Sequence, residues 1–435
     1  MPWITESAPE ISREQIKILL DRTLEEARTR ICGSPKRVLL LPPDITRMHS
    51  GAGWITEYLY QALADVADVH VIPTLGQHEP HTAEQNQTMF GAIPQERIHA
   101  HDWRHGVVQV GEVAADFVAE VSGGAADWAM PIWLNQKLIE EPWDLIINVG
   151  HVVPHEVLGF ANHNKNYFIG LGGKDLICAS HMAAACCGIE NNLGNLLTPV
   201  RQCFNKAEDD FLGGLPDLYV QVVLARNPRG ELAHTGFYAG DDLETYLSAA
   251  RQSRDQNITV LDEPLDKVVC VMQADEFFST WVANKAVYRT RMALADQGEL
   301  VIIAPGLKRF GEQAEVDALI RKYGYCGTPR VMEQYRANAD MQDLAHATAH
   351  LIHGSSEGRF QITYAPGHLQ REDVESVNFQ FADLEQTLAR YPIADLSEGM
   401  NEINGERIFF IPTPSAGLWA TREKLFDRQS GFGQN

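Results

Sequence analysis

The sequence has no long hydrophobic stretch, no excess of positive charge and no leader-like start. No apolar run approaches the roughly 20 residues that a membrane-spanning helix needs, and residues 1–6 lack the basic and apolar regions of a signal peptide. The net charge of −22 at pH 7 repels nucleic acid and anionic membranes. We therefore expect a soluble, cytoplasmic protein that binds neither nucleic acid nor membrane; assembly into a homo-oligomer stays open.

Cysteine is sparse and irregularly spaced. The seven cysteines include no Cys-x-x-Cys pair and no zinc-finger spacing, and Cys186 and Cys187 are adjacent, which is poor geometry for an ordinary disulfide. We expect reduced, mostly buried thiols.

What the sequence does contain is an alternation of short apolar runs with helical patterns, which predicts an α/β protein with mainly parallel sheets. The expected strands are 37–41, 69–73, 144–149, 218–224, 267–272, 299–304, 361–364 and 408–411. The expected helices are 12–28, 54–67, 243–253, 278–296 and 312–323.

At 435 residues the chain exceeds the size of one growing core, so two domains are expected. We predict domains at 1–262 and 263–412, each a mainly parallel sheet flanked by helices, with the active site in the cleft between them. Residues 413–435 are predicted to pack back on the first domain.

Polar motifs follow three of the expected strands. Asp44-Ile-Thr-Arg47 follows the first, Gly76-Gln-His78 the second, and His151-Val-Val-Pro-His155 the third. Because ligands bind at the carboxyl ends of strands in open α/β sheets, these motifs predict one shared site.

The histidines of this region allow more than one chemistry. His151 and His155 are four apart, which would place them on one face of a helix and could bind zinc, although Pro154 lies between them and the glutamate of an HExxH motif is absent. Alternatively, His78 and His155 could stand on opposite sides of a planar carbon and exchange a proton, as a racemase or epimerase requires. Each histidine could also be purely structural.

Other residues of these segments suit ligand binding. Arg47 has the planar fork that binds carboxylate or phosphate, or it pairs with Asp44 within the loop; Thr46 could cap a helix. Lys165 lies between Gly159-Phe160 and the glycines of 170–173, which would let backbone approach a bulky ligand. A solvated surface lysine is the simpler alternative.

Taken together, these residues resemble the lactate racemase family, whose members use a nickel-pincer nucleotide cofactor. The resemblance spans Asp44 to His181 and rests on the order of these motifs. The separations of ten residues from His155 to Lys165, and of sixteen from Lys165 to His181, match the family pattern.

The resemblance implies a role for each residue. Lys165 would be joined covalently to the cofactor, a nickel-bearing pyridinium-dithiocarboxylate mononucleotide, and His181 would complete the nickel coordination. His78 and His155 would be the catalytic acid–base pair. The cofactor-binding residues would be Asp44, Thr46, Arg47 and Lys285. Cofactor-biosynthesis proteins would then be needed for maturation.

The implied reaction is inversion at C2 of a 2-hydroxy acid by reversible hydride transfer to the cofactor. The chain departs from the family pattern at Met48, where proline is usual, and at Ala161-Asn-His-Asn164, where small residues are usual. Lys174 is a competing tether, but it would break both histidine spacings.

The polar side chains of residues 162–164 could hydrogen-bond a polyhydroxylated chain, which favours a sugar acid such as gluconate as substrate. Three alternatives remain: a racemase of lactate or another short 2-hydroxy acid, a zinc- or iron-dependent lyase or hydrolase using the same histidines, and a non-catalytic cofactor carrier or sugar-acid-binding protein.

Overall fold

The computed structural model describes residues 1–31, 33–227 and 229–427. The chain divides into two compact units. The first comprises residues 1–180 and 193–257, and the second comprises residues 181–192 together with the chain from residue 258 onward. Segment 181–192 therefore belongs to a different unit from the residues on either side of it.

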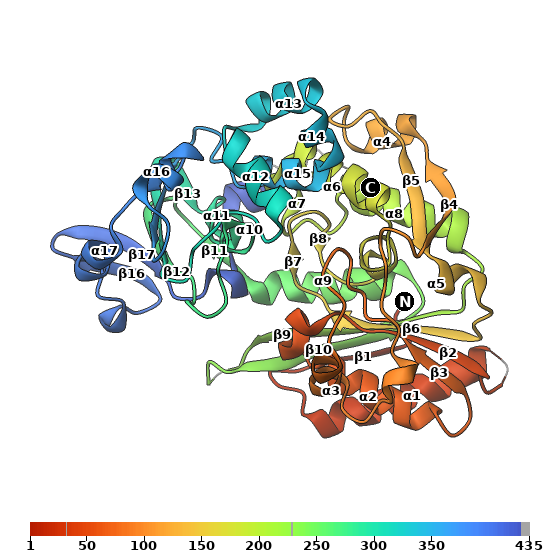
Figure 1. Cartoon of the computed structure of the whole chain (residues 1–435). Helices are drawn as coiled ribbons and strands as arrows, with labels where there is room; N and C mark the ends of the chain where they lie inside the picture. Colours follow the sequence, from red (N-terminus) through yellow and green to blue (C-terminus); the bar gives the residue numbers. More distant parts are fainter. Residues whose placement is uncertain (32, 228, 428–435) are drawn as a thin grey trace. The chain divides into compact units, whose positions relative to one another are not determined.

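A six-stranded sheet forms the centre of the first unit, in the order β1-β10-β9-β6-β2-β3 (Figure 1). Strands β9, β6, β2 and β3 are parallel, and β1 and β10 complete the sheet in antiparallel fashion. The six strands are β1 (Ile4–Ser7), β2 (Arg37–Leu41), β3 (Asp68–Val71), β6 (Leu145–His151), β9 (Asp217–Arg226) and β10 (Leu232–Gly240).

Helices cover both faces of this sheet. Its other elements are α1 (Arg13–Arg30), η1 (Ile45–Ser50), α2 (Ala52–Leu63), α3 (Ala83–Phe90), η2 (Gln95–Arg97), β4 (Val107–Val113), α4 (Ala115–Val121), β5 (Met130–Asn135), α5 (Gln136–Glu140), β7 (Pro154–His155), β8 (Gly159–Phe160), η3 (Asn166–Gly170), α8 (Pro199–Ala207), η4 (Glu208–Leu212) and α9 (Leu243–Asn257). Helix α6 (Lys174–Cys187) runs from the first unit into the second, and α7 (Ile189–Asn192) belongs to the second.

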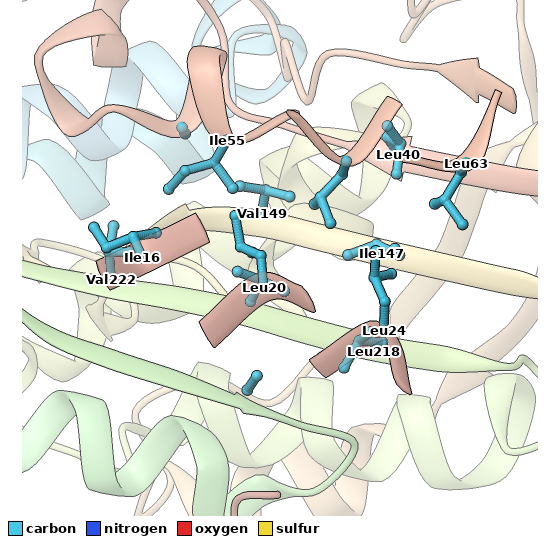
Figure 2. Packing of buried hydrophobic residues seen from close by; sticks show 14 of the residues in the cluster. Ile16, Leu20, Leu24, Leu40, Ile55, Leu63, Ile147, Val149, Leu218 and Val222 are labelled. Atoms are coloured by element: carbon cyan, nitrogen blue, oxygen red, sulfur yellow. The ribbon is translucent and has the colours of Figure 1, made fainter. Parts of the chain in front are cut away.

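The core of the first unit lies between the sheet and α1 and α2. Helix α1 starts at Ser12, which forms a capping box with Gln15. Alternate residues of the central strands, such as Ile147 and Val149 of β6, meet the apolar stripe of α1 that includes Leu20, as Figure 2 shows. This packing fixes one face of the sheet, so the loops at its edges are held by rigid elements.

The second unit has its own six-stranded sheet, in the order β15-β14-β13-β12-β17-β16, parallel except for β16. Its strands are β12 (Leu265–Val271), β13 (Leu294–Ala304), β14 (Gln361–Pro366), β15 (Gln380–Phe381), β16 (Gly399–Ile403) and β17 (Glu406–Ile411), and a separate parallel pair is β11 (Ile258–Leu261) with β18 (Leu418–Thr421). The helices are α10 (Thr280–Ala283), α11 (Lys285–Thr290), α12 (Ala314–Tyr323), α13 (Thr328–Ala337), α14 (Ala339–Asp343), α15 (Ala345–His353), α16 (Arg371–Ser376), α17 (Leu384–Arg390), η5 (Ile393–Asp395), η6 (Pro414–Ala416) and η7 (Glu423–Asp427).

The predicted α/β class with mainly parallel sheets is confirmed. The predicted helix 278–296 is wrong in its last part, because β13 already begins at Leu294, whose backbone pairs with Leu265. The predicted domain limits stay predictions, as do the interdomain location of the active site and the packing of 413–435 on the first domain. Residues 428–435 of that tail lie outside the described residues.

Within the described residues, no helix is both long and apolar enough to cross a membrane. The six described cysteines form no disulfide, and Cys32 lies outside the described residues.

Candidate functional site

The three polar motifs of the first unit follow strands that are neighbours in the sheet. Strand β2 pairs with both β6 and β3, all in parallel. The carboxyl ends of these strands therefore lie along one edge, where Asp44 follows β2, His78 follows β3 and His151 ends β6. The convergence predicted from the sequence is found in the structure.

Asp44 organises the loop after β2. It caps η1, and its carboxylate accepts hydrogen bonds from the backbone N–H of Thr46 at 3.1 Å and from the Thr46 hydroxyl at 2.5 Å. Burial alone would raise the pKa of Asp44, but His78, Thr46 and the charge of Arg47 outweigh it and lower the pKa to about 2. Asp44 is therefore ionised at neutral pH.

His78 is oriented by that carboxylate. Its Nδ1 is hydrogen-bonded to Asp44, whereas its side chain is 62% exposed. A carboxylate can only accept, so Nδ1 carries the proton and the neutral ring has its lone pair on Nε2.

The loop that carries His78 is attached to the segment that carries Lys165. The backbone N–H of Gly76 donates to the carbonyl of Gly170 at 2.9 Å. A Cβ at Gly170 would lie 2.4 Å from the side chain of Thr74, so this close approach requires glycine. The two segments are therefore positioned relative to each other by backbone contacts.

Lys165 precedes η3 and is partly buried. Burial, together with the positive charge of Arg47, lowers its pKa to about 8, and the nearby carboxylates of Asp44 and Glu156 oppose that shift. About a tenth of the Lys165 amine is therefore neutral and nucleophilic at pH 7, far more than of an ordinary lysine. Lys174, the competing tether, is exposed at the start of α6.

His155 lies in a two-stranded hairpin formed by β7 and β8. Its Nδ1 accepts a hydrogen bond from the backbone N–H of Val157 at 3.2 Å, which places the proton of the neutral ring on Nε2. Gly159 holds the hairpin against the loop at Asn195: its φ is +74°, and a Cβ there would lie 1.8 Å from the Asn195 carbonyl oxygen.

The backbone around His151 and His155 is extended, so the predicted helical face is wrong. His151 ends β6, His155 lies in β7, and extended residues four apart do not share a helical face. Within the described parts of the chain, no three His, Cys, Asp or Glu side chains are grouped as metal ligands, which gives the zinc alternative no support.

Residues 162–164, between β8 and Lys165, turn into the protein. Asn162 and His163 have positive φ angles, and all three side chains are buried. His163 stacks on Tyr219 with ring centroids 3.9 Å apart, and Asn164 donates to Glu208 at 2.8 Å. The expectation that His163 and Asn164 contact a polar substrate is therefore wrong.

Arg201 holds this segment in place and was not singled out by the sequence analysis. Fully buried in α8, it donates to the Phe160 carbonyl at 2.8 Å and to the side chain of Asn164, and its guanidinium carbon lies 4.3 Å from the centre of the Tyr246 ring. No sequence motif marks an arginine 36 residues after Lys165 as its support.

His81 is a second residue that the sequence analysis passed over. Its Nε2 accepts from the backbone N–H of Ile45 at 2.9 Å, and burial lowers its pKa. It thereby joins the loop after β3 to the start of η1. Its position three residues after His78 was the only available signal.

The remaining predicted residues belong to the second unit. His181 is partly buried within α6, in segment 181–192. Lys285 begins α11, with its Nζ 5.8 Å from the centre of the Phe277 ring. Their roles stay predictions.

Comparison with known proteins agrees with this architecture. The crystal structure of a protein from Thermotoga maritima matches with a TM-score of 0.79 and 22% identity, covering 96% of this chain and all of that one. The lactate racemase apoprotein from Thermoanaerobacterium thermosaccharolyticum matches with a TM-score of 0.68 and 16% identity, covering 96% of this chain and 94% of that one. No curated protein matches significantly. Residues 5–192 match the family model of the lactate racemase N-terminal domain.

Proposed function

We propose that the protein is a nickel-pincer nucleotide-dependent racemase or epimerase that inverts C2 of a 2-hydroxy acid. The observation that carries the proposal is the opposite hydrogen bonding of the two histidines. Nδ1 of His78 donates to Asp44, whereas Nδ1 of His155 accepts from Val157. In their neutral forms, His78 thus presents a proton acceptor at Nε2 and His155 presents a proton donor there.

Such a pair suits inversion. One histidine removes the substrate hydroxyl proton as the carbon becomes planar, and the other supplies a proton to the oxygen when the centre is re-formed on the opposite face. After one turnover the two protonation states are exchanged, so the reverse reaction begins with the roles reversed. Asp44 keeps the ring of His78 oriented through their hydrogen bond.

The residues present fit the cofactor. Lys165 has an amine whose pKa of about 8 suits covalent attachment, and Arg47 lies close enough to influence that pKa. We propose that Thr46 and Arg47 hold the cofactor phosphate, that His181 ligates nickel, and that Lys285 contacts cofactor or substrate. Because the carboxylate of Asp44 is taken up by His78 and Thr46, we assign it to orienting His78. When bound, the cofactor supplies a reversible hydride acceptor.

The proposed substrate is a sugar acid such as gluconate, and the residue that supports this proposal is His151 rather than residues 162–164. His151 is 8% exposed, and neither of its ring nitrogens has a hydrogen-bond partner. Burial and the charge of Arg47 lower its pKa well below the usual range, so it is a neutral donor and acceptor. A substrate with hydroxyl groups beyond C2 would satisfy it, whereas lactate offers only a methyl group.

The test is NMR of stereochemical inversion at C2, with cofactor-loaded protein and a panel from lactate to gluconate. Inversion of gluconate but not lactate supports both reaction and substrate. Inversion of lactate alone overturns the substrate proposal. Absence of inversion on every 2-hydroxy acid, with nickel and covalent adduct confirmed by mass spectrometry, overturns the reaction.

Variants separate the roles. His78→Asn and His155→Asn should keep the covalent adduct but lose about 100-fold or more in turnover, whereas Lys165→Ala should lose the adduct. Lys174→Ala is the matched control and should keep both. Full activity of either histidine variant would remove that residue from the acid–base pair.

A further inference from the structure

A cavity of about 520 Å³ lies at the opposite edge of the first sheet from the candidate active site. It is bounded by Leu145 at the start of β6 and Asp217 at the start of β9, which are the amino ends of two parallel strands. Residues after the antiparallel strand β10 and at the end of α1 complete it. Nothing in the proposed reaction uses this cavity.

The cavity combines carboxylates with apolar walls. The carboxylates of its lining are Glu208, Asp209, Asp217, Asp241 and Asp242. The apolar part of the lining includes Trp3, Ile31, Leu145, Leu212, Leu215 and Leu243. The volume falls within the range of small-molecule sites and is far larger than a bare metal ion needs.

Three of these carboxylates, on Glu208, Asp209 and Asp217, form no ion pair within the described residues. Glu208 is bonded to the hydroxyl of Tyr219 and to Asn164, and Asp217 to the hydroxyl of Tyr167. Across the described residues, no lysine or arginine forms an ion pair with Glu208, Asp209 or Asp217. Burial, with the charges of Glu208 and Asp241, raises the pKa of Asp217 well above its usual range, as expected for a buried carboxyl without a cation.

The one cationic side chain of the lining is already engaged. Arg30 pairs with Glu26 at 2.9 Å and lies over the ring of Trp3, with its guanidinium carbon 4.3 Å from the ring centre. Asp242 differs from the other carboxylates because it is bonded to the amino terminus of Met1. The unpaired carboxylates are thus those nearest η4 and the start of β9.

His163 is the independent sign of a ligand. It lines the cavity and is 2% exposed, yet neither ring nitrogen makes a well-formed hydrogen bond. Its pKa is lowered to about 3, by burial first and by the charge of Arg201 second, so the ring is neutral and has an acceptor nitrogen. A buried polar group without a partner costs stability unless a ligand or water satisfies it.

We propose that this cavity binds a small aliphatic diamine or polyamine. The ammonium groups would pair with Glu208, Asp209 and Asp217, with Asp217 releasing its proton to solvent on binding, and would donate to the His163 ring, while the methylene chain would pack on the apolar walls. An anion is disfavoured by these carboxylates, and no described group of three metal-ligating side chains is present. Since Glu208 also holds Asn164, next to Lys165, an occupant would contact the support of the Lys165 segment.

The test is isothermal titration of the full-length protein with 1,4-diaminobutane and spermidine at about 0.15 M salt, which screens the diffuse attraction of a highly negative protein. The uncharged 1,4-butanediol is the matched probe. Asp217→Asn and Asp209→Asn should each weaken diamine binding at least tenfold. Asp210→Asn removes a neighbouring carboxylate that pairs with Lys206 outside the cavity, and it should leave binding unchanged.

The binding measurements on these variants can support or overturn the diamine site. Diamine binding that is lost in Asp209→Asn and kept in Asp210→Asn supports the site, and this comparison stands even if Asp217→Asn does not fold. His163→Phe, which keeps the ring stacked on Tyr219, should weaken binding as well. No binding to the folded wild-type protein at millimolar diamine, or equal binding by all carboxylate variants, overturns the proposal.

Discussion

Lys165 differs from most lysines of this chain in its surroundings. With its pKa lowered from 10.5 to about 8, it is neutral in a far larger fraction at pH 7.5 than an exposed lysine. Competitive labelling with an amine-reactive reagent between pH 6 and 10, read by peptide mass spectrometry, should show a midpoint near 8 for Lys165. Exposed Lys174 is the internal reference. Equal pH profiles for the two lysines would contradict the assigned environment.

Asp44 should make folding stability depend on pH. Its pKa falls from 3.8 to about 2 on folding, so ionised Asp44 stabilises the folded protein above pH 4, and this contribution is lost as the pH falls towards 2. The shift corresponds to about 2 kcal/mol. Urea unfolding of wild type and Asp44→Asn should differ by about that amount at pH 6 and converge near pH 2. A difference that does not change with pH would argue against the shift.

At this scale the sequence was informative about chain order but not about the direction of side chains. Asp44, His78 and His151 were predicted to converge because the ends of the strands before them can be recognised from the apolar pattern, and these strands are neighbours in the sheet. His163 was misplaced because its partner, Tyr219, is on a strand that comes 56 residues later. The support that Arg201 gives to the Lys165 segment is likewise a tertiary contact without a local pattern.

Among the elements, the β7–β8 hairpin tests whether close packing at Gly159 positions His155. In Gly159→Ala the alanine must adopt a positive φ and its Cβ would clash with the Asn195 carbonyl. In Gly230→Ala the alanine must adopt a positive φ of +81°, but no atom lies within 4 Å of the added Cβ. We expect a loss of about 1 kcal/mol at Gly230 and about 3 kcal/mol or more at Gly159. Thermal unfolding measures both, and equal losses would show that the Asn195 contact is unimportant.

Helix α8 supports the segment that carries Lys165 through a single buried cation. Arg201→Met keeps much of the volume but leaves Asn164 and the Phe160 carbonyl without their donor, so we expect a loss of about 3 kcal/mol. Arg226→Met is the control, because the Arg226 side chain is exposed and, among the described residues, donates only to the Gly230 carbonyl. Equal urea midpoints for the two variants would contradict this support role.

Elements with strong patterns were predictable and those set by pairing were not. Strand β2 lies at the predicted residues because its Val-Leu-Leu-Leu run is buried on both faces. Strands β1 and β10 were not predicted from the sequence. Strand β1 has only one buried residue in four and is defined by its pairing to β10. The helix predicted over 278–296 was too long because the apolar residues at its end are equally compatible with a strand, and they form the start of β13.

At the scale of the whole molecule, segment 181–192 belongs to the second unit although it lies within the sequence of the first. Glu190 of this segment is buried between Arg291 and Arg359, at 3.1 and 2.6 Å. The segment was not predictable, because its composition continues the helix that precedes it. A chain ending at residue 257 should therefore aggregate or bind a hydrophobic dye, as judged by size-exclusion chromatography. Co-expression with residues 258–435 should reverse this, and a monomeric, cooperatively folding 1–257 would contradict it.

The passage of α6 from one unit to the other also imposes an order in time. A ribosome adds about 5 to 20 residues per second, so the second unit is completed on the order of 10 to 50 s after residue 192 has been made. The residues of the first unit around Lys165 are made first, whereas His181, sixteen residues later, belongs to a unit whose remaining residues begin at residue 258. Under the roles proposed for Lys165 and His181, attachment of the cofactor and nickel binding would both be possible only after residues of the second unit beyond 258 have been made.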